Sequence, residues 1–178
     1  MSRCLAFKFS QSSILCILTL FFITSGVTQE ALDEQALTKH VRDSVVTIRH
    51  MDRTGNENGV GTGFIIDENG LVATSLHVIG EARAIEVQLA DGSRHEPVSV
   101  HAWDRTLDLA VIRLDLKDLK PLPLGDSDAL SPGEKVIAVG NPMGLERSVV
   151  NGLISGFRRF DHARMIQLAI PIEPGNSG

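Results

Sequence analysis

The stretch GTGFIIDENGLVATSLHV, residues 61 to 78, shows most clearly how this chain folds. Apolar residues, several of them β-branched, run through residues 60–66 and return over residues 71–74, as in two short strands. The four residues between them, DENG at 67–70, predict a hairpin turn because Asn-Gly readily takes the positive φ that tight turns need. A histidine, His77, follows the second strand. We therefore expect a hairpin that leads directly to a side chain able to accept a proton.

Short strands and turns continue along most of the chain. The residues at 51–59 and 91–92 are typical of a loop and a turn, and the prolines and glycine within 121–125 suit a linker between two lobes. Strands are expected over residues 44–50, 60–66, 71–74, 84–89, 94–103, 109–114, 135–139, 148–155 and 165–172. Many short strands with frequent turns predict an all-β barrel or sandwich.

The N-terminal segment differs from the rest of the chain. Arg3 and Lys8 give a basic start, residues 14–23 form an uncharged apolar run, and small residues follow at 24–26. This three-part layout predicts a signal peptide over residues 1–26 and a secreted or periplasmic location. The apolar run is shorter than the roughly 20 residues that span a bilayer, so no stable membrane insertion is expected after cleavage. An uncleaved anchor is the alternative.

Residues 27–43 are predicted to form an N-terminal helical segment, because apolar residues recur there at 31, 32, 37 and 41. Both cysteines, Cys4 and Cys16, lie in the predicted signal peptide, so we expect no disulfide after its removal. Removal also lowers the basic count from 17 to 15 against 22 acidic residues, a net charge of −7. That charge argues against a nucleic-acid partner. The histidines lack metal-ligand spacing, so neither a metal nor a cofactor is predicted.

Three side chains are candidates for chemistry, and each has a structural alternative. Ser177 lies among glycines that permit a sharp turn with its amides on one side, as an oxyanion site requires, although GNSG also suits an ordinary turn. His77 is placed to act as a general base, but a histidine at the foot of a hairpin is often structural. Asp108 precedes a buried apolar strand, where a carboxylate needs a partner such as a histidine. A turn-capping role is equally common, and Asp104 and Asp115 are rivals.

Several motifs in order resemble the HtrA/Deg family of trypsin-like serine proteases over about residues 41 to 178. The stretch around the family's catalytic histidine is resembled by residues 61–66, 70–74 and 77–78. The stretch around its aspartate is resembled by Asp108-Leu109-Ala110-Val111. Residues 124–127, 132–134 and 139–142 resemble the opening of its second barrel, and residues 174–178 its nucleophile loop. The order histidine, aspartate, serine is that of the trypsin-like arrangement.

The resemblance implies an all-β, trypsin-like double β-barrel whose second barrel is incomplete. Residues 44–120 would form the first barrel, with His77 and Asp108, and residues 121–178 a partial second barrel that ends at the nucleophile loop. Ser177 would be the nucleophile, His77 the general base and acid, and Asp108 its orienter. The amides of Gly175 and Ser177 would form the oxyanion hole. The implied reaction is hydrolysis of peptide bonds in polypeptide substrates through an acyl-enzyme, in protein quality control, with homo-oligomers a further expectation.

The chain also departs from the family pattern. Ser75-Leu76 stands where the family often has Asn-Ala, and LAIPIE at 168–173 replaces a segment that usually contains an acid. We expect a chain that stops at Gly178, before the strands that close the second barrel, to be a fragment that is inactive or poorly folded alone. A divergent secreted trypsin-like peptidase is one alternative to a strict HtrA member. The other is a catalytically compromised, protease-like module that binds peptides or acts as a chaperone.

Overall fold

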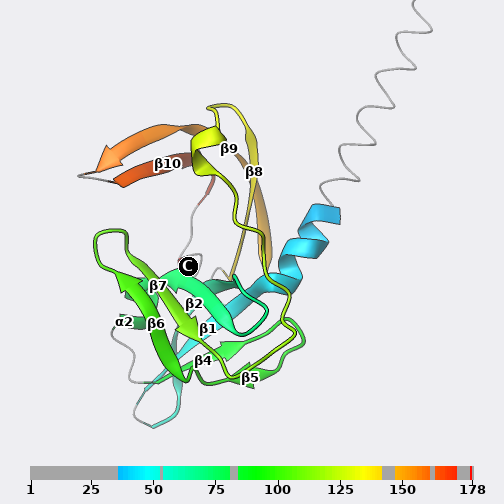
Figure 1. Ribbon diagram of the computed structural model, residues 1–178, viewed down its shortest axis with the longest axis vertical. Coiled ribbons are helices and arrows are strands. Elements are labelled where there is room, and N and C mark those ends of the chain that lie inside the picture. The colour runs from blue at the N-terminus through cyan, green and yellow to red at the C-terminus, as the bar shows by residue number, and fades with distance from the viewer. Residues whose placement is uncertain are drawn as a thin grey trace, which may run out of the picture. The chain divides into compact units, whose positions relative to one another are not determined.

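The computed structural model describes residues 36–52, 54–80, 84–141, 147–160, 163–171 and 177. Contacts divide the chain into Met1–Leu37 and Thr38–Gly178, and both β-sheets belong to the second unit (Figure 1). The predicted signal peptide lies outside the described residues, and the predicted helical segment is described only from residue 36, where residues 36–44 are helical. No helix within the described ranges is long and apolar enough to cross a membrane.

The larger sheet contains seven strands, and each pair of neighbours is antiparallel. Its order is β5-β4-β1-β2-β3-β7-β6. The strands are β1 Val45–Met51, β2 Glu57–Ile65, β3 Leu71–Ser75, β4 Ala84–Gln88, β5 Arg94–His95, β6 Ser99–Asp104 and β7 Leu109–Arg113. The two outermost strands, β5 and β6, are separated by residues 96–98 alone. Four residue steps span at most about 14 Å, whereas seven flat strands extend over about 29 Å. The sheet is therefore curled.

The connection between β5 and β6 corrects one prediction. Residues 94–103 were expected to form a single strand, but the structure has two, paired with opposite edges of the sheet. His95 of β5 pairs with Val87 of β4, whereas Ser99 of β6 pairs with Arg113 of β7. Pro97 lies between them and has no N–H to donate to a ladder, so it is a natural point for the chain to leave one edge. The prediction of one continuous strand was therefore wrong.

The curled sheet encloses an aliphatic core. Alternation decides which side chains enter it: in β7, Ala110 and Ile112 are buried while Leu109 is exposed. Its buried members are Val46, Ile48, Ile65, Val72, Val78, Val87, Leu89, Ile112 and Leu114. Branched aliphatic residues predominate, and no aromatic ring of the described residues is among these core members, as expected from a chain with so few aromatic residues.

The hairpin that opened the sequence argument forms as predicted. β2 and β3 pair through Phe64 with Ala73, and the turn between them has Gly70 at a φ of +100°. Any side chain at Gly70 would also meet the carbonyl oxygen of Leu114, 2.3 Å from the position of its Cβ. Glycine is therefore required there both for conformation and for space. The hairpin fixes where β3 ends, and hence where His77 lies.

The smaller sheet contains three strands in the order β10-β9-β8: β8 Lys135–Gly140, β9 Ser148–Phe160 and β10 Ala163–Ala169. β9 is longer than the predicted strand over 148–155. A short 3₁₀ helix, η1 Ser127–Ala129, begins at Asp126, whose side chain accepts a hydrogen bond from the amide of Asp128. The described part of the chain is thus all-β apart from short helices, and its strands form two sheets, as expected.

Candidate active site

The pairing of β3 with β7 brings His77 and Asp108 together across 31 positions of sequence. Ser75, the last residue of β3, lies opposite Leu109, the first residue of β7. His77 follows in the one-turn helix α2, Leu76–Gly80, and Asp108 immediately precedes β7. In an antiparallel pair, the end of one strand meets the start of its partner. The register alone therefore places the two candidates side by side.

Asp108 binds His77 through both of its carboxylate oxygens. Oδ1 accepts a hydrogen bond from the His77 amide at 2.9 Å, and Oδ2 lies 2.5 Å from Nδ1 of the ring. The carbonyl oxygen of Asp108 also accepts a hydrogen bond from the amide of Leu76, at 2.9 Å. Three contacts thus hold the aspartate against the start of α2. They direct Nδ1 of His77 at the carboxylate and leave Nε2 as the ring nitrogen on the opposite side.

The backbone and the charge of Asp108 both reflect this arrangement. Its φ is +52°, a left-handed conformation that aspartate adopts more readily than most residues. Burial acts to raise the pKa of the carboxyl group, but the hydrogen bonds and positive charge of His77 outweigh it, so the pKa lies below its usual value. Asp108 is therefore ionised at neutral pH and available as an acceptor for the imidazole.

The rival acid Asp104 has a different role. Its Oδ1 accepts hydrogen bonds from the amides of Thr106 and Leu107, at 2.7 and 3.1 Å, which caps the turn between β6 and β7. Among the other histidines, His95 contacts Ser93 at 3.0 Å, and His40 and His101 are exposed. His162 lies outside the described residues. Among the described residues, the histidine and aspartate that form an ion pair are His77 and Asp108, the two that the sequence singled out.

Ser177 is bound to β2 through its backbone. Its carbonyl oxygen accepts a hydrogen bond from the amide of Thr62, at 2.7 Å, and the residue is exposed. Gly175, the other predicted contributor to the oxyanion hole, lies outside the described residues. This backbone hydrogen bond therefore holds Ser177 against β2.

Gly61 is where the two halves of the candidate site approach each other. A Cβ atom at Gly61 would lie 2.5 Å from Cγ1 of Val78 and 3.4 Å from the carbonyl oxygen of Ser177. Val78 is the neighbour of His77 in α2, so the helix with the histidine and the segment with the serine contact the same residue of β2. The absence of a side chain at Gly61 permits this close approach.

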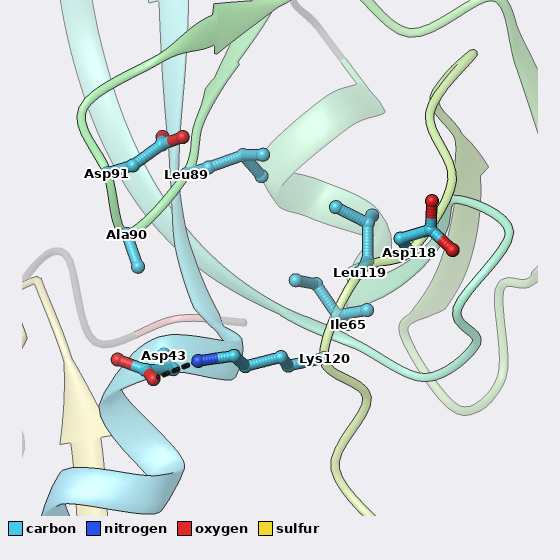
Figure 2. A pocket seen from close by; sticks show the side chains of 8 residues that line it. All are labelled: Asp43, Ile65, Leu89, Ala90, Asp91, Asp118, Leu119 and Lys120. Carbon is cyan, nitrogen blue, oxygen red and sulfur yellow. Dashed lines mark hydrogen bonds and ion pairs between the residues drawn. The ribbon is translucent and has the colours of Figure 1, made fainter.

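A separate cavity of about 340 Å³ lies elsewhere on the same unit (Figure 2). Its lining includes the apolar side chains of Ile65, Leu89 and Leu119 together with charged side chains. Lys120 forms an ion pair with Asp43 at 2.7 Å, which lowers the pKa of that carboxyl group. None of the three candidate residues is in this lining, and Lys120, the one cation among the described lining residues, is paired with Asp43. The cavity is therefore distinct from the histidine–aspartate pair.

Comparison with known proteins identifies the class to which this fold and site belong. Residues 61–178 match the family described as the trypsin-like peptidase domain, and the chain belongs to that family. Its strands form the trypsin-like double β-barrel with an incomplete second barrel.

Within the class, the chain is similar to proteases of the HtrA/DegP type. It is 37% identical over 152 residues to "Probable periplasmic serine endoprotease DegP-like" of Buchnera aphidicola, covering 82% of this chain and 32% of that protein. The protein of the same name in Halomonas elongata is 42% identical over 67% of this chain and 26% of its own length. A solved HtrA-type protease, AlgW with a tripeptide, matches with a TM-score of 0.72 and 31% identity over 79% of this chain and 47% of its own. The chain thus spans about a third or less of these two curated relatives.

Sequence reasoning missed the part played by Thr62 and Asn141. Both residues belong to motifs used above for the family resemblance, but neither was given a role. A signal was available for Asn141, because an amide side chain directly after the apolar strand at 135–139 must find hydrogen-bond partners if it is buried. Asn141 is fully buried, and its partners include Thr62.

Proposed function

We propose that this chain contains the catalytic groups of a serine endopeptidase, with Ser177, His77 and Asp108 as its triad. The observation that supports this most strongly is the double hydrogen bond from His77 to Asp108. A carboxylate that holds both the amide and Nδ1 of a histidine fixes the ring orientation and its tautomer. Nε2 then carries the lone pair that a serine hydroxyl requires.

The proposed reaction follows from these roles. Oγ of Ser177 forms a bond to the carbonyl carbon of the peptide while Nε2 of His77 accepts the hydroxyl proton. The tetrahedral oxyanion would be bound by the amides of Gly175 and Ser177. The C–N bond then breaks, and His77 donates its proton to the leaving amine. Water, activated by the same imidazole, attacks the resulting ester and regenerates Ser177. Asp108 remains ionised and stabilises the imidazolium at both steps.

The substrate class and location rest on the relatives. Proteins named as periplasmic serine endoproteases support polypeptide substrates and a periplasmic or secreted location for the whole protein. A structure solved with a tripeptide supports peptide recognition by the same fold. A role in protein quality control and assembly into homo-oligomers remain predictions from the family resemblance.

Active-site labelling of the full-length protein tests the proposal. A fluorophosphonate reacts covalently with a serine only when a neighbouring base activates it. We expect one adduct per chain, located on Ser177 by mass spectrometry of the digested protein, and no adduct in Ser177→Ala. Ser99→Ala is the matched control: it removes an exposed hydroxyl from β6, and labelling should be unchanged.

Two results would count against a protease. Labelling that persists in Ser177→Ala would show that another residue is the nucleophile. A folded protein with no adduct that still retains unfolded polypeptides would favour the alternative, a peptide-binding or chaperone module with a protease fold.

A further inference from the structure

One residue of the seven-stranded sheet contacts two separate segments that follow strands of the smaller sheet. The amide of Thr62 donates to the carbonyl oxygen of Ser177 at 2.7 Å. Its hydroxyl oxygen accepts from the backbone amide of Asn141 at 3.0 Å and from Nδ2 of the same residue at 3.2 Å. Asn141 directly follows β8, and Ser177 lies in the segment after β10. Thr62 therefore forms hydrogen bonds both to the residue that follows β8 and to the segment that follows β10.

The pairing of β2 explains why Thr62 can make these contacts. β2 pairs with β1 along its length, and Thr62 lies opposite Thr47. On its other side, β2 pairs with β3 only at Phe64 and Ile65. At Thr62 that side of the strand is bound instead by Ser177, through the amide, and by the hydroxyl of Thr74, which donates to the Thr62 carbonyl at 2.7 Å.

Asn141 is itself held on several sides. It is fully buried, Nδ2 also lies 3.2 Å from the carbonyl oxygen of Val46, and Oδ1 accepts a hydrogen bond from the amide of Arg147 at 2.9 Å. A buried amide with this many partners has a single favourable orientation. Its contacts to Thr62 therefore fix the side chain of Thr62, and with it the position of the backbone amide that binds Ser177.

We propose that Thr62 and Asn141 form a positioning pair that fixes Ser177 relative to His77. This rests on the proposed function for its catalytic consequence, but the positioning itself is a property of the fold. Neither residue touches the reacting atoms. Their effect passes through the hydrogen bond between the amide of Thr62 and the carbonyl oxygen of Ser177.

Thr62→Val is the direct test in the full-length protein. It keeps the shape of the side chain and the backbone amide but removes the acceptor for both donors of Asn141. Because small displacements of a nucleophile have large effects on rate, we expect fluorophosphonate acylation of Ser177 to slow by roughly ten- to a hundredfold. Thr62→Ser retains the hydroxyl and should restore a rate within about threefold of the wild type.

Thr47→Val is the matched control. Thr47 is buried directly opposite Thr62, and its hydroxyl has no hydrogen-bond partner within the described part of the chain. The same chemical change therefore removes no contact to Asn141, and acylation should remain at the wild-type rate. Comparing the three variants well below their melting temperatures separates positioning from loss of stability.

Hydrogen exchange gives a readout that does not depend on catalysis. The amide at position 62 donates to Ser177, so its exchange rate reports that contact directly. We expect it to exchange about tenfold faster or more in Thr62→Val and in Asn141→Ala, and at the wild-type rate in Thr47→Val. Should Thr62→Val fail to fold, Asn141→Ala removes the other side of the same contact.

The outcomes are distinguishable. If wild-type protein is not labelled, the proposed function fails, while faster exchange in Thr62→Val would still support the positioning pair. If exchange and acylation in Thr62→Val and Asn141→Ala match those of Thr47→Val, the positioning pair is wrong even though Ser177 is labelled.

Discussion

The two sheets of this chain differ in how completely they bury their side chains. In the seven-stranded sheet, residues such as Val46, Ile48 and Ile112 are fully buried. Among the described residues of the three-stranded sheet, Ile154 is the one hydrophobic residue buried to this degree, whereas Phe160, Met165 and Leu168 are exposed. His77 follows β3 and Asp108 precedes β7 of the first sheet, and Ser177 follows the last strand of the second. His77 and Asp108 are therefore held beside the packed core of the first sheet, whereas Ser177 depends on contacts made to that sheet.

The largest expected effect comes from the pair on the packed sheet. Asp108→Asn removes the carboxylate that binds the backbone amide and Nδ1 of His77 and favours the wrong tautomer of the imidazole. We therefore expect kcat to fall by about 10⁴-fold with little change in KM. Peptide hydrolysis by the full-length protein measures this. Asp104→Asn is the control, since Asp104 only caps a turn. An equal loss in both variants would mean that Asp108 has no special relation to His77.

The second prediction compares the two sheets in stability. Ile112→Ala leaves a cavity in the core and should lower the free energy of unfolding by about 2–5 kcal/mol. Leu168→Ala truncates a side chain on β10 that is already 37% exposed, and should cost less than about 1 kcal/mol. Denaturant unfolding of the full-length protein checks both values. Equal losses would contradict the unequal burial of the two sheets.

The third prediction concerns the contact between the two regions. Gly61→Ala places a methyl group 2.5 Å from Cγ1 of Val78, so Val78 in α2 or the β2 backbone must shift. We expect roughly ten- to a hundredfold slower acylation of Ser177. Gly156→Ala is the matched control on β9, where an added Cβ meets nothing within 4 Å. If both variants react at the wild-type rate, the close approach at Gly61 is not important for the site.

The smallest expected effect concerns acid pH. The pKa of Asp108 is lower in the folded chain than in the unfolded chain. Its contribution to stability is therefore present above the unfolded pKa and is lost as the pH falls through the folded pKa. Asp108→Asn should consequently show a flatter decline of unfolding free energy below pH 4 than the wild type, measured by denaturant titration. A steeper decline in the variant would mean that folding raises the pKa of Asp108 instead of lowering it.

Much of the fold could be predicted from local sequence patterns. The hairpin over residues 60–74 and most strands follow from alternation and turn residues, whereas the choice of His77 and Asp108 over their rivals rested on the ordered motifs of the family resemblance. The break at Pro97 and the pairing of β5 and β6 with opposite edges could not, because alternation indicates a strand but not its partner. The contacts of Thr62 with Asn141 and Ser177 join residues 79 and 115 positions apart, and such contacts depend on how the two sheets meet rather than on local pattern.

His77, which follows a strand of one sheet, and Ser177, which follows a strand of the other, are proposed to act as one catalytic unit, and a double-mutant cycle tests this most directly. His77→Ala, Ser177→Ala and the double variant would be compared by kcat for peptide hydrolysis in the full-length protein. If the residues act together, the double variant should lose no more than either single variant, because each change alone removes the whole mechanism. Losses that multiply in the double variant would show that the two residues act independently and would contradict the triad.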